Sequence, residues 1–212
     1  MLTAILLLAA AAAPAKVAAT PIFAETPTGW RMGKATARTK LVEYGSLNCS
    51  HCANFSGFAS GPIAVAVRAG RASFEFRPYL IFPHDVAATL IARCVPVSRR
   101  FGFVEAYYRS SGEFTKKLQA ADPAVIEAAR AKGGASFNRT LVELAVMKPL
   151  AARFGLSAPA VERCIAAPAG TAWLEKSFAA AKTAGVSGTP AFFLNGKSVN
   201  IGSADELTAL LK

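Results

Sequence analysis

Two cysteines separated by two residues, in Cys49-Ser50-His51-Cys52, are the side chains of this chain best suited to chemistry. Two intervening residues allow the sulfurs to close a small disulfide ring within one turn of a helix. If a helix begins at this motif, its free N–H groups and partial positive charge stabilise the Cys49 thiolate. A protonated His51 adds a favourable charge, which lowers the pKa of Cys49 and makes its sulfur a better leaving group in disulfide exchange. The motif therefore predicts a redox pair in which Cys49 reacts and a buried Cys52 resolves the intermediate.

A second candidate feature is Thr189-Pro190, which stands directly before the apolar run Ala191-Phe192-Phe193-Leu194. A proline that precedes a strand and is flanked by a flexible glycine is a place where a cis peptide bond is often kept. The pattern favours a cis bond between Thr189 and Pro190.

The patterns around both features predict an α/β protein. An arm at 20–40 leads to a strand at 41–44, then to a helix that begins at 49–51, and then to a half-buried strand at 72–78. Gly57, Gly61 and Pro62 are expected to kink or interrupt that helix. Helical periodicity starts at Asp85, a plausible N-cap, and continues over 101–109, 122–132, 138–154, 158–166 and 171–184. A strand at 191–194, an Asn195-Gly196 type I′ turn, a return strand at 197–201 and a helix at 205–212 complete the prediction.

This order of motifs resembles the thioredoxin fold, and more narrowly the DsbA-like family of exported thiol:disulfide oxidoreductases. The resemblance is carried by the strand that runs into Cys49-Ser50-His51-Cys52, and by Thr189-Pro190 before the Phe-Phe-Leu strand and its Asn-Gly turn. It implies a thioredoxin fold with an inserted all-helical domain between the two halves of the thioredoxin motif. The expected divisions are a signal peptide at 1–19, an N-terminal arm and first half at 20–84, the helical insertion at 85–168 and the second half at 169–212.

The resemblance also implies roles for individual residues. Glu43 matches the family's buried carboxylate, six residues before the first motif cysteine, which handles protons for the buried cysteine. Pro190 matches the cis-proline that faces the disulfide, and Thr189 the residue whose backbone pairs with the substrate chain. Two alternatives stay open: Glu43 as an edge charge on a solvated strand face, and His51 as a neutral, solvent-facing side chain. Ser50 replaces the proline of the best-studied oxidases, so their oxidant strength does not carry over.

The other two cysteines, Cys94 and Cys164, lie on apolar stripes of two predicted helices. A structural disulfide between these helices is the leading hypothesis, and some DsbA-like proteins carry such a second cystine. Closing so long a loop would contribute about 4 kcal/mol in the chain-entropy model. The alternative is a pair of reduced core cysteines.

The segment 1–13 is apolar and uncharged, and it is shorter than the roughly 20 residues that span a bilayer. It is typical of the apolar region of a secretory signal peptide, with cleavage after Val17-Ala18-Ala19; a buried N-terminal helix is the alternative. We expect a periplasmic protein, in which paired cysteines form disulfides.

Composition argues against several other classes. The chain carries 24 Lys and Arg against 13 Asp and Glu, a net charge of +11, but the basic residues are scattered, so a nucleic-acid site is not expected. Attraction to an anionic membrane surface is a more natural use of the charge. Half a zinc site at the cysteine motif would need a second Cys-x-x-Cys motif or a histidine pair, and the sequence has neither. We expect no metal and no cofactor.

The predicted function is an oxidase that introduces disulfides into exported proteins. Its expected partners are unfolded or partly folded cysteine-containing exported proteins and a DsbB-like, quinone-linked membrane reoxidant. The roughly 20 residues between the cleavage site and the first strong strand are too few for the separate dimerisation domain of disulfide isomerases, which also predicts a monomer. A reductase or isomerase kept reduced by a membrane donor remains an alternative because of Thr189. A chaperone-like binder of extended chains without redox turnover is the third.

Overall fold

The computed structural model describes residues 22–212, so the predicted signal peptide lies outside the described residues. Within this part the chain forms one six-stranded sheet in the order β1-β2-β4-β3-β5-β6. The strands are β1 (Phe23–Thr26), β2 (Gly29–Met32), β3 (Thr39–Gly45), β4 (Ala72–Pro78), β5 (Ala191–Leu194) and β6 (Lys197–Val199). The helices are α1 (Ser50–Arg68), α2 (Pro83–Cys94), α3 (Val97–Gln119), α4 (Pro123–Ala131), α5 (Gly134–Leu144), α6 (Lys148–Arg153), α7 (Ala158–Ala166), α8 (Pro168–Thr183) and α9 (Ala204–Leu210).

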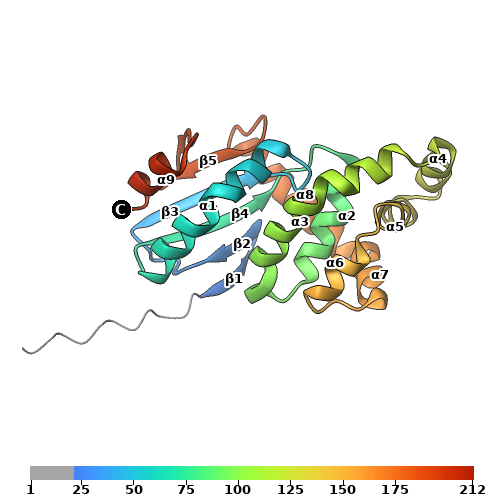
Figure 1. Cartoon of the computed structure of the whole chain (residues 1–212), viewed down its shortest axis with the longest axis horizontal. Coiled ribbons are helices and arrows are strands. Elements are labelled where there is room, and N and C mark those ends of the chain that lie inside the picture. Colours follow the sequence, from blue (N-terminus) through green and yellow to red (C-terminus); the bar gives the residue numbers. More distant parts are fainter. Residues whose placement is uncertain (1–21) are drawn as a thin grey trace, which may run out of the picture.

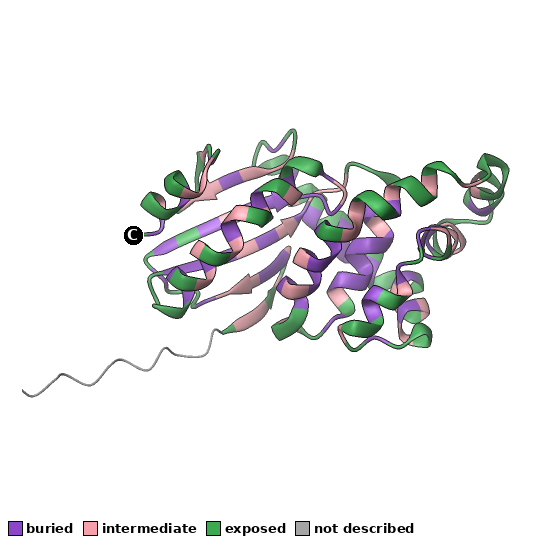
Figure 2. Ribbon diagram, in the orientation of Figure 1, coloured by how far each residue is buried: buried purple, intermediate pink, exposed green. Residues whose placement is uncertain are grey.

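The helices α2 to α7 form a block beside the sheet, as Figure 1 shows, while α1 lies along one sheet face. In the chain the helices α2 to α8 stand between β4 and β5, and α8 returns to contact β4. Buried residues concentrate in the strands and on the inward sides of the helices (Figure 2). The core therefore runs from the sheet into the helical block without a break, and one cluster of buried side chains includes residues of both.

The centre of the sheet is β3, which pairs in parallel with β4 and antiparallel with β5. Glu43 in this strand stands opposite Phe76 of β4 and Phe192 of β5. Because β3 lies between β4 and β5, a side chain on its α1-facing side is covered by residues of these two strands and by the helix. This placement decides the environment of Glu43.

The described part of the expected arm is instead a hairpin of two short strands, which corrects the sequence prediction. The strands β1 and β2 pair antiparallel, and β2 continues the sheet by pairing with β4. Trp30 of β2 is fully buried and stacks on Phe76, with ring centroids 5.1 Å apart. Each strand has only four residues, too few for alternation to be recognised, and the hairpin is held by contacts with residues distant in the sequence.

Helix α1 is uninterrupted over its 19 residues, so the expected interruption at Gly57, Gly61 and Pro62 is wrong. One stripe of this helix is buried, and Cys52, Phe55, Ala59 and Ile63 on it pack into the core. Burial of this stripe offsets the local cost of glycine and proline in a helix. The single helix expected at 138–154 is two helices, α5 and α6, because Pro149 starts a new helix more readily than it continues an old one.

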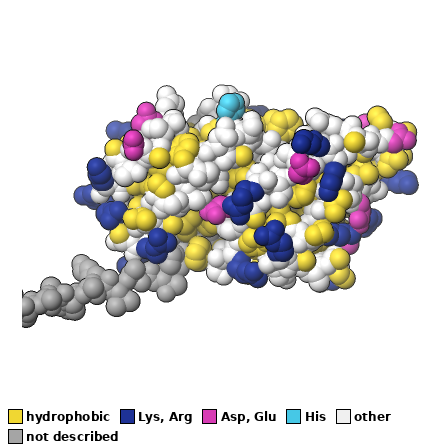
Figure 3. Space-filling model, in the orientation of Figure 1, with side chains coloured by type: hydrophobic (Ala, Val, Ile, Leu, Met, Phe, Trp, Pro, Cys, Tyr) yellow, Lys and Arg dark blue, Asp and Glu magenta, His cyan; other side chains and the backbone are white. Residues whose placement is uncertain are grey.

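Lys and Arg side chains are scattered over the face seen in Figure 3 and are not gathered into one patch. No helix within residues 22–212 has the length and apolar character needed to cross a membrane.

Candidate active site

Cys49 is the N-cap residue of α1, with extended backbone angles, and it lies directly after the loop that leaves β3. The backbone N–H of Cys52 donates to the Cys49 sulfur at 3.4 Å. The Cys49 sulfur also lies 3.5 Å from the carbonyl oxygen of Thr189, and the Thr189–Pro190 peptide bond is cis. The structure thus brings together the two features that the sequence analysis singled out, which are 140 positions apart.

The two thiols have opposite electrostatic environments. The pKa of Cys49 is lowered to about 5, chiefly by a hydrogen bond from the Cys52 thiol and further by Thr189 and by the backbone N–H groups of Cys52 and His51, against an opposing effect of burial. The pKa of Cys52 is raised, because its proton is held by Cys49 and because its side chain is fully buried. Both cysteines are free thiols in the structure. At neutral pH the pair therefore consists of a thiolate at Cys49 and a thiol at Cys52.

His51 is exposed and lines a groove that runs past the motif. The groove has a volume of about 840 Å³. Its walls are the exposed side of α1 and the chain around the cis-proline and the last hairpin, including Asn54, Phe58, residues 185–193 and residues 198–202. Because the Cys49 sulfur contacts Thr189 on this wall, an extended peptide in the groove would pass beside the reactive sulfur.

Glu43 is buried, with 3% of its surface exposed. The alternative interpretation, in which Glu43 is an edge charge on a solvated strand face, is therefore wrong. Burial raises its pKa to about 8, and the negative charge of Cys49 adds to the rise. Among the described residues its Oε1 atom is buried without a hydrogen-bond partner. A carboxyl group that titrates near neutral pH and interacts with both cysteines is suited to proton transfer.

A buried polar network under the loop before Cys49 escaped the sequence analysis. Its centre is Asp85, which is fully buried. Asp85 accepts hydrogen bonds from the Ser46 hydroxyl at 2.9 Å and from the side-chain amide of Asn48 at 2.7 Å. It also accepts from the backbone N–H groups of Ile81 and Phe82. The expectation that Asp85 is the N-cap of α2 is therefore wrong: it lies in the first turn of the helix, three residues after the N-cap residue Phe82, and anchors two loops.

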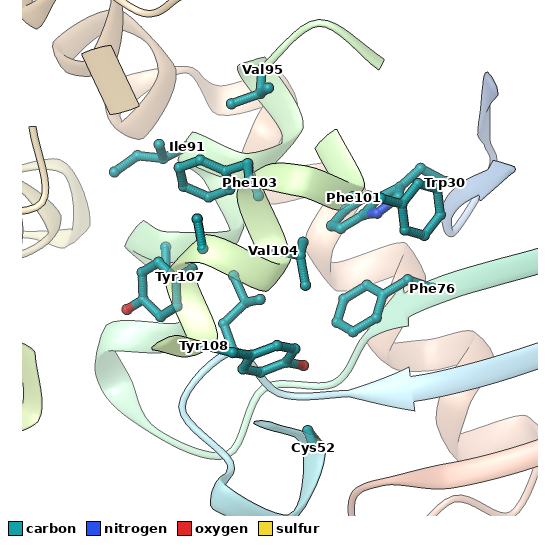
Figure 4. Close-up of a cluster of buried hydrophobic side chains, with 14 of the residues drawn as sticks. Trp30, Cys52, Phe76, Ile91, Val95, Phe101, Phe103, Val104, Tyr107 and Tyr108 are labelled. Atoms are coloured by element: carbon teal, nitrogen blue, oxygen red, sulfur yellow. The ribbon is translucent and has the colours of Figure 1, made fainter. Parts of the chain in front are cut away.

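Two tyrosines of α3 reach the same loop. The Tyr107 hydroxyl donates to the Asn48 side-chain oxygen at 3.1 Å, and the Tyr108 hydroxyl donates to the Ser46 carbonyl at 3.3 Å. Figure 4 shows Tyr108 extending from α3 toward Cys52. No local pattern distinguishes these tyrosines from ordinary core aromatics, so sequence reasoning had no signal for them. Through them the helical block positions the loop that carries Cys49.

Cys94 and Cys164 are joined by a disulfide that links the end of α2 to α7, with Cα atoms 6.2 Å apart. Cys94 is exposed and Cys164 is half-buried, so the bond lies at the surface and not on a core stripe as expected. The alternative of two reduced core cysteines does not describe this pair.

Within residues 22–212 no group of three or more His, Cys, Asp or Glu side chains is arranged to hold a metal ion. The groups of the site that can take part in chemistry are the Glu43 carboxyl group and the thiols of Cys49 and Cys52, beside the groove.

Comparison with known proteins gives three kinds of result. A family model described as thioredoxin matches residues 25–212. A search of curated proteins returned no match. Among solved structures, a protein-disulfide isomerase from Novosphingobium aromaticivorans is 26% identical with a TM-score of 0.76, over 85% of this chain and 96% of that one.

Two further solved structures share the fold at lower identity. Alpha-DsbA1 from Wolbachia pipientis is 18% identical with a TM-score of 0.67, over 88% of this chain and 90% of that one. DsbA from Chlamydia trachomatis is 17% identical with a TM-score of 0.63, over 89% of this chain and 94% of that one.

Proposed function

The chain belongs to the thioredoxin family and to its thiol:disulfide oxidoreductases, and from this premise we propose that it is of the DsbA-like type and acts as an oxidase that introduces disulfides into exported proteins. The predicted fold class, a thioredoxin fold of the DsbA kind, is confirmed. The proposal includes the direction of electron flow, the role of the Cys49-Ser50-His51-Cys52 motif, export and the partners.

The observation that carries the oxidase direction is the position of the Cys49 sulfur at the N-cap of α1, hydrogen-bonded by Cys52. A low pKa at Cys49 stabilises the reduced enzyme relative to its disulfide form. An enzyme whose reduced form is stabilised draws electrons from client thiols. It therefore works as an oxidant of those clients.

The proposed cycle starts from a disulfide between Cys49 and Cys52. A client thiolate attacks the Cys49 sulfur, the Cys49–Cys52 bond breaks, and Cys52 leaves as a thiolate that takes up a proton. A second client thiolate then attacks the client sulfur of the mixed disulfide, and Cys49 leaves as a stabilised thiolate. The client has lost two electrons to the enzyme and holds the new disulfide.

The surroundings supply the other requirements of this cycle. The groove beside Pro190 accepts an extended client chain, whose backbone lies along Thr189. Glu43 acts as the proton donor and acceptor for Cys52, since its charge influences the pKa of Cys52. His51, exposed on the groove wall, contacts the client, and its backbone N–H helps to stabilise the Cys49 thiolate. A DsbB-like, quinone-linked membrane protein reoxidises the enzyme, which works in the periplasm as a monomer.

The reduction potential of the Cys49–Cys52 pair tests this proposal, measured by equilibration with reduced and oxidised glutathione. We expect a value well above that of thioredoxin, about −270 mV. A reduction potential near that value would rule out the oxidase direction, but it would still be compatible with a thiol:disulfide exchange enzyme. A Cys49→Ser variant that keeps full activity on a reduced, two-cysteine client would rule out thiol exchange at this site; the double variant Cys94→Ala with Cys164→Ala, which leaves the motif intact, is the matched control.

A disulfide isomerase is the second candidate, favoured by the 26% identity with the protein-disulfide isomerase of Novosphingobium aromaticivorans and by Thr189 before the cis-proline. An isomerase would be active only when added in its reduced form. The recovery of activity from a client with scrambled disulfides, with oxidised and reduced enzyme compared, separates the two candidates.

A further inference from the structure

The sheet face opposite α1 is covered only in part. Helix α8 lies over the end of this face where β4 stops, and the Ser177 hydroxyl of α8 lies within hydrogen-bonding distance of the carbonyl oxygens of Thr28 and Pro78. Beyond α8 the same face holds an open cleft of about 740 Å³. Small-molecule sites in proteins have volumes of about 300–1,000 Å³, so the cleft has the size of a ligand site.

The side chains that line this cleft come from four strands. Those of β3 alternate with Glu43, which faces α1, and therefore lie on the other side of the sheet. The register of the sheet brings their neighbours in β2, β4 and β5 to the same side. The lining residues that matter for binding are Arg31, Lys40, Val42, Glu75, Arg77 and Phe193.

The lining of the cleft is strongly basic. Arg31, Arg38, Lys40 and Arg77 carry positive charges, and Glu75 is the one carboxylate among the described residues of the lining. Arg77 neutralises this carboxylate, because its Nε lies 2.9 Å from one oxygen of Glu75 and its Nη2 lies 3.2 Å from the other. The other three cations therefore have no counter-charge within the cleft.

Arg31 is the first free cation. It stands directly opposite Glu75 in the antiparallel ladder of β2 and β4, where opposite charges attract each other. Its Nε nevertheless donates to the carbonyl oxygen of Gly33 at 3.3 Å, and within residues 22–212 Arg31 forms no ion pair. Glu75 is already held by Arg77 and by the Thr26 hydroxyl, which donates to it at 2.8 Å. The Nη groups of Arg31 are thus free to donate to a ligand.

Lys40 is the second free cation, and it forms no ion pair in the described part of the chain. Its backbone N–H donates to the side-chain oxygen of Asn195 at 2.9 Å, and the Asn195 N–H donates back to the Lys40 carbonyl at 2.9 Å. These bonds fix the turn beside the cleft and leave the side-chain NH₂ of Asn195 as a further donor. The strands of Arg31 and Lys40 are separated by β4, which places them about 10 Å apart. Both side chains are long enough to reach one anionic group between them.

We propose that this cleft binds a small amphiphilic anion, a carboxylate or phosphate ester with an aromatic or aliphatic body. The oxygens of the anion accept hydrogen bonds from Arg31 and Lys40, since guanidinium and ammonium groups are the usual partners of carboxylates and phosphates. The apolar body of the ligand lies on Val42 and Phe193. The inference goes beyond the proposed function and does not depend on it, because the cleft shares only Phe193 with the groove beside Cys49.

A dissolved molecule fits this site better than a bilayer surface does. Val42 and Phe193 are half-buried in the floor of the cleft. A flat layer of lipid headgroups meets the rim of a hollow and brings no apolar group to its floor, whereas a small molecule can enter and contact both the cations and the floor.

Isothermal titration calorimetry with phenyl phosphate tests the site. We expect saturable binding of one molecule per chain, which weakens as salt is added because exposed charges are screened. Benzyl alcohol, which lacks the anion, and inorganic phosphate, which lacks the ring, should each bind at least about tenfold more weakly. Arg31→Gln and Lys40→Gln should each weaken the binding of phenyl phosphate by about tenfold, the loss expected for a hydrogen bond to a charged group.

Arg163→Gln is the matched control, since it removes the same charge from an exposed position on α7, outside the cleft. Lys40→Arg, which keeps the charge, should retain most of the affinity, and urea unfolding midpoints close to that of the wild type would show that the variants are folded. Equal affinity in Arg31→Gln, Lys40→Gln and Arg163→Gln would overturn the site, because the attraction would then come from the net charge alone. Equal binding of inorganic phosphate and phenyl phosphate would overturn the amphiphilic ligand.

A wild-type protein that shows no saturable binding of phenyl phosphate at millimolar concentrations would also overturn the proposal. Cosedimentation with phosphatidylglycerol vesicles, compared with phosphatidylcholine vesicles, is the last arm of the test. Vesicle binding that requires Arg31 and Lys40, in a protein that does not bind phenyl phosphate, would assign these cations to a membrane surface and refute the small-ligand site.

Discussion

Replacing Cys52 by alanine tests what holds the Cys49 thiolate. The variant loses the thiol whose hydrogen bond is the largest contribution to the low pKa of Cys49, but it keeps the backbone N–H groups of the helix N-terminus. A hydrogen bond to a charged group contributes about 1.5–3 kcal/mol. One pKa unit corresponds to about 1.4 kcal/mol, so the pKa of Cys49 should rise from about 5 to about 6–7.

The assay is the rate of alkylation by iodoacetamide as a function of pH. Only Cys49 reports in it, because Cys94 and Cys164 are joined in a disulfide and the buried Cys52 holds its proton with a raised pKa. The midpoint of the rate profile gives the pKa of Cys49 in both proteins. Ser50→Ala is the control, since this exposed residue of the same motif is not among the causes of the shift.

If Cys52→Ala titrates at the same pH as the wild type, the hydrogen bond between the two thiols is not what lowers the pKa. The helix N-terminus would then carry the effect alone. An intermediate result, with a rise well below one unit, would mean that a water molecule takes the place of the lost thiol and donates to Cys49, and it would refute the magnitude worked out above.

Three other predictions concern stability, measured by denaturant unfolding. The double variant Cys94→Ala with Cys164→Ala should lose about 4 kcal/mol of unfolding free energy while keeping its exchange activity; an unchanged midpoint would mean that the surface disulfide constrains the unfolded chain less than its loop length implies. In the oxidised protein the Cys49 charge is absent, but burial still raises the pKa of Glu43, so the folded state binds more protons than the unfolded state and stability should fall as the pH rises above about 4.3. Glu43→Gln should flatten this fall by up to about 4 kcal/mol at pH 8, and equal pH slopes would contradict the assigned burial. Gly57→Ala, whose new Cβ meets nothing within 4 Å, should raise the free energy of unfolding by about 1 kcal/mol. Gly29→Ala, whose Cβ would clash with the backbone oxygen of Phe76 in β4, should lower it by at least about 1–3 kcal/mol. A neutral result at both positions would contradict the described packing.

The features that could be predicted from the sequence are those written in neighbouring residues. The bounds predicted for the strands at 72–78 and 191–194 match β4 and β5, because alternation and a run of bulky apolar residues are local signals. The Asn195-Gly196 turn has the two positive φ angles that a type I′ turn requires. The two cysteines and the proline of the site were found in the same way.

What escaped prediction depends on contacts between distant residues. Trp30 is buried because β2 joins β4 and places its ring against Phe76, which no local pattern around Trp30 reveals. Asp85 near a helix start looks the same in sequence whether it caps the helix or, as here, gathers hydrogen bonds from two loops. Tyr108 has the spacing of a core residue, and only the fold shows that its hydroxyl reaches the loop before Cys49.

These long-range contacts give the helical block a part in the chemistry of the sheet domain. The loop before Cys49 is held by Asp85 of α2 and by Tyr107 and Tyr108 of α3, so the position of the Cys49 sulfur over Thr189 depends on how the block is seated. A hydrogen bond stabilises a thiolate only when the donor and the sulfur are held in alignment, since the interaction weakens steeply with misalignment. By fixing this loop, the block helps to maintain the difference in pKa between Cys49 and Cys52 on which directional exchange depends.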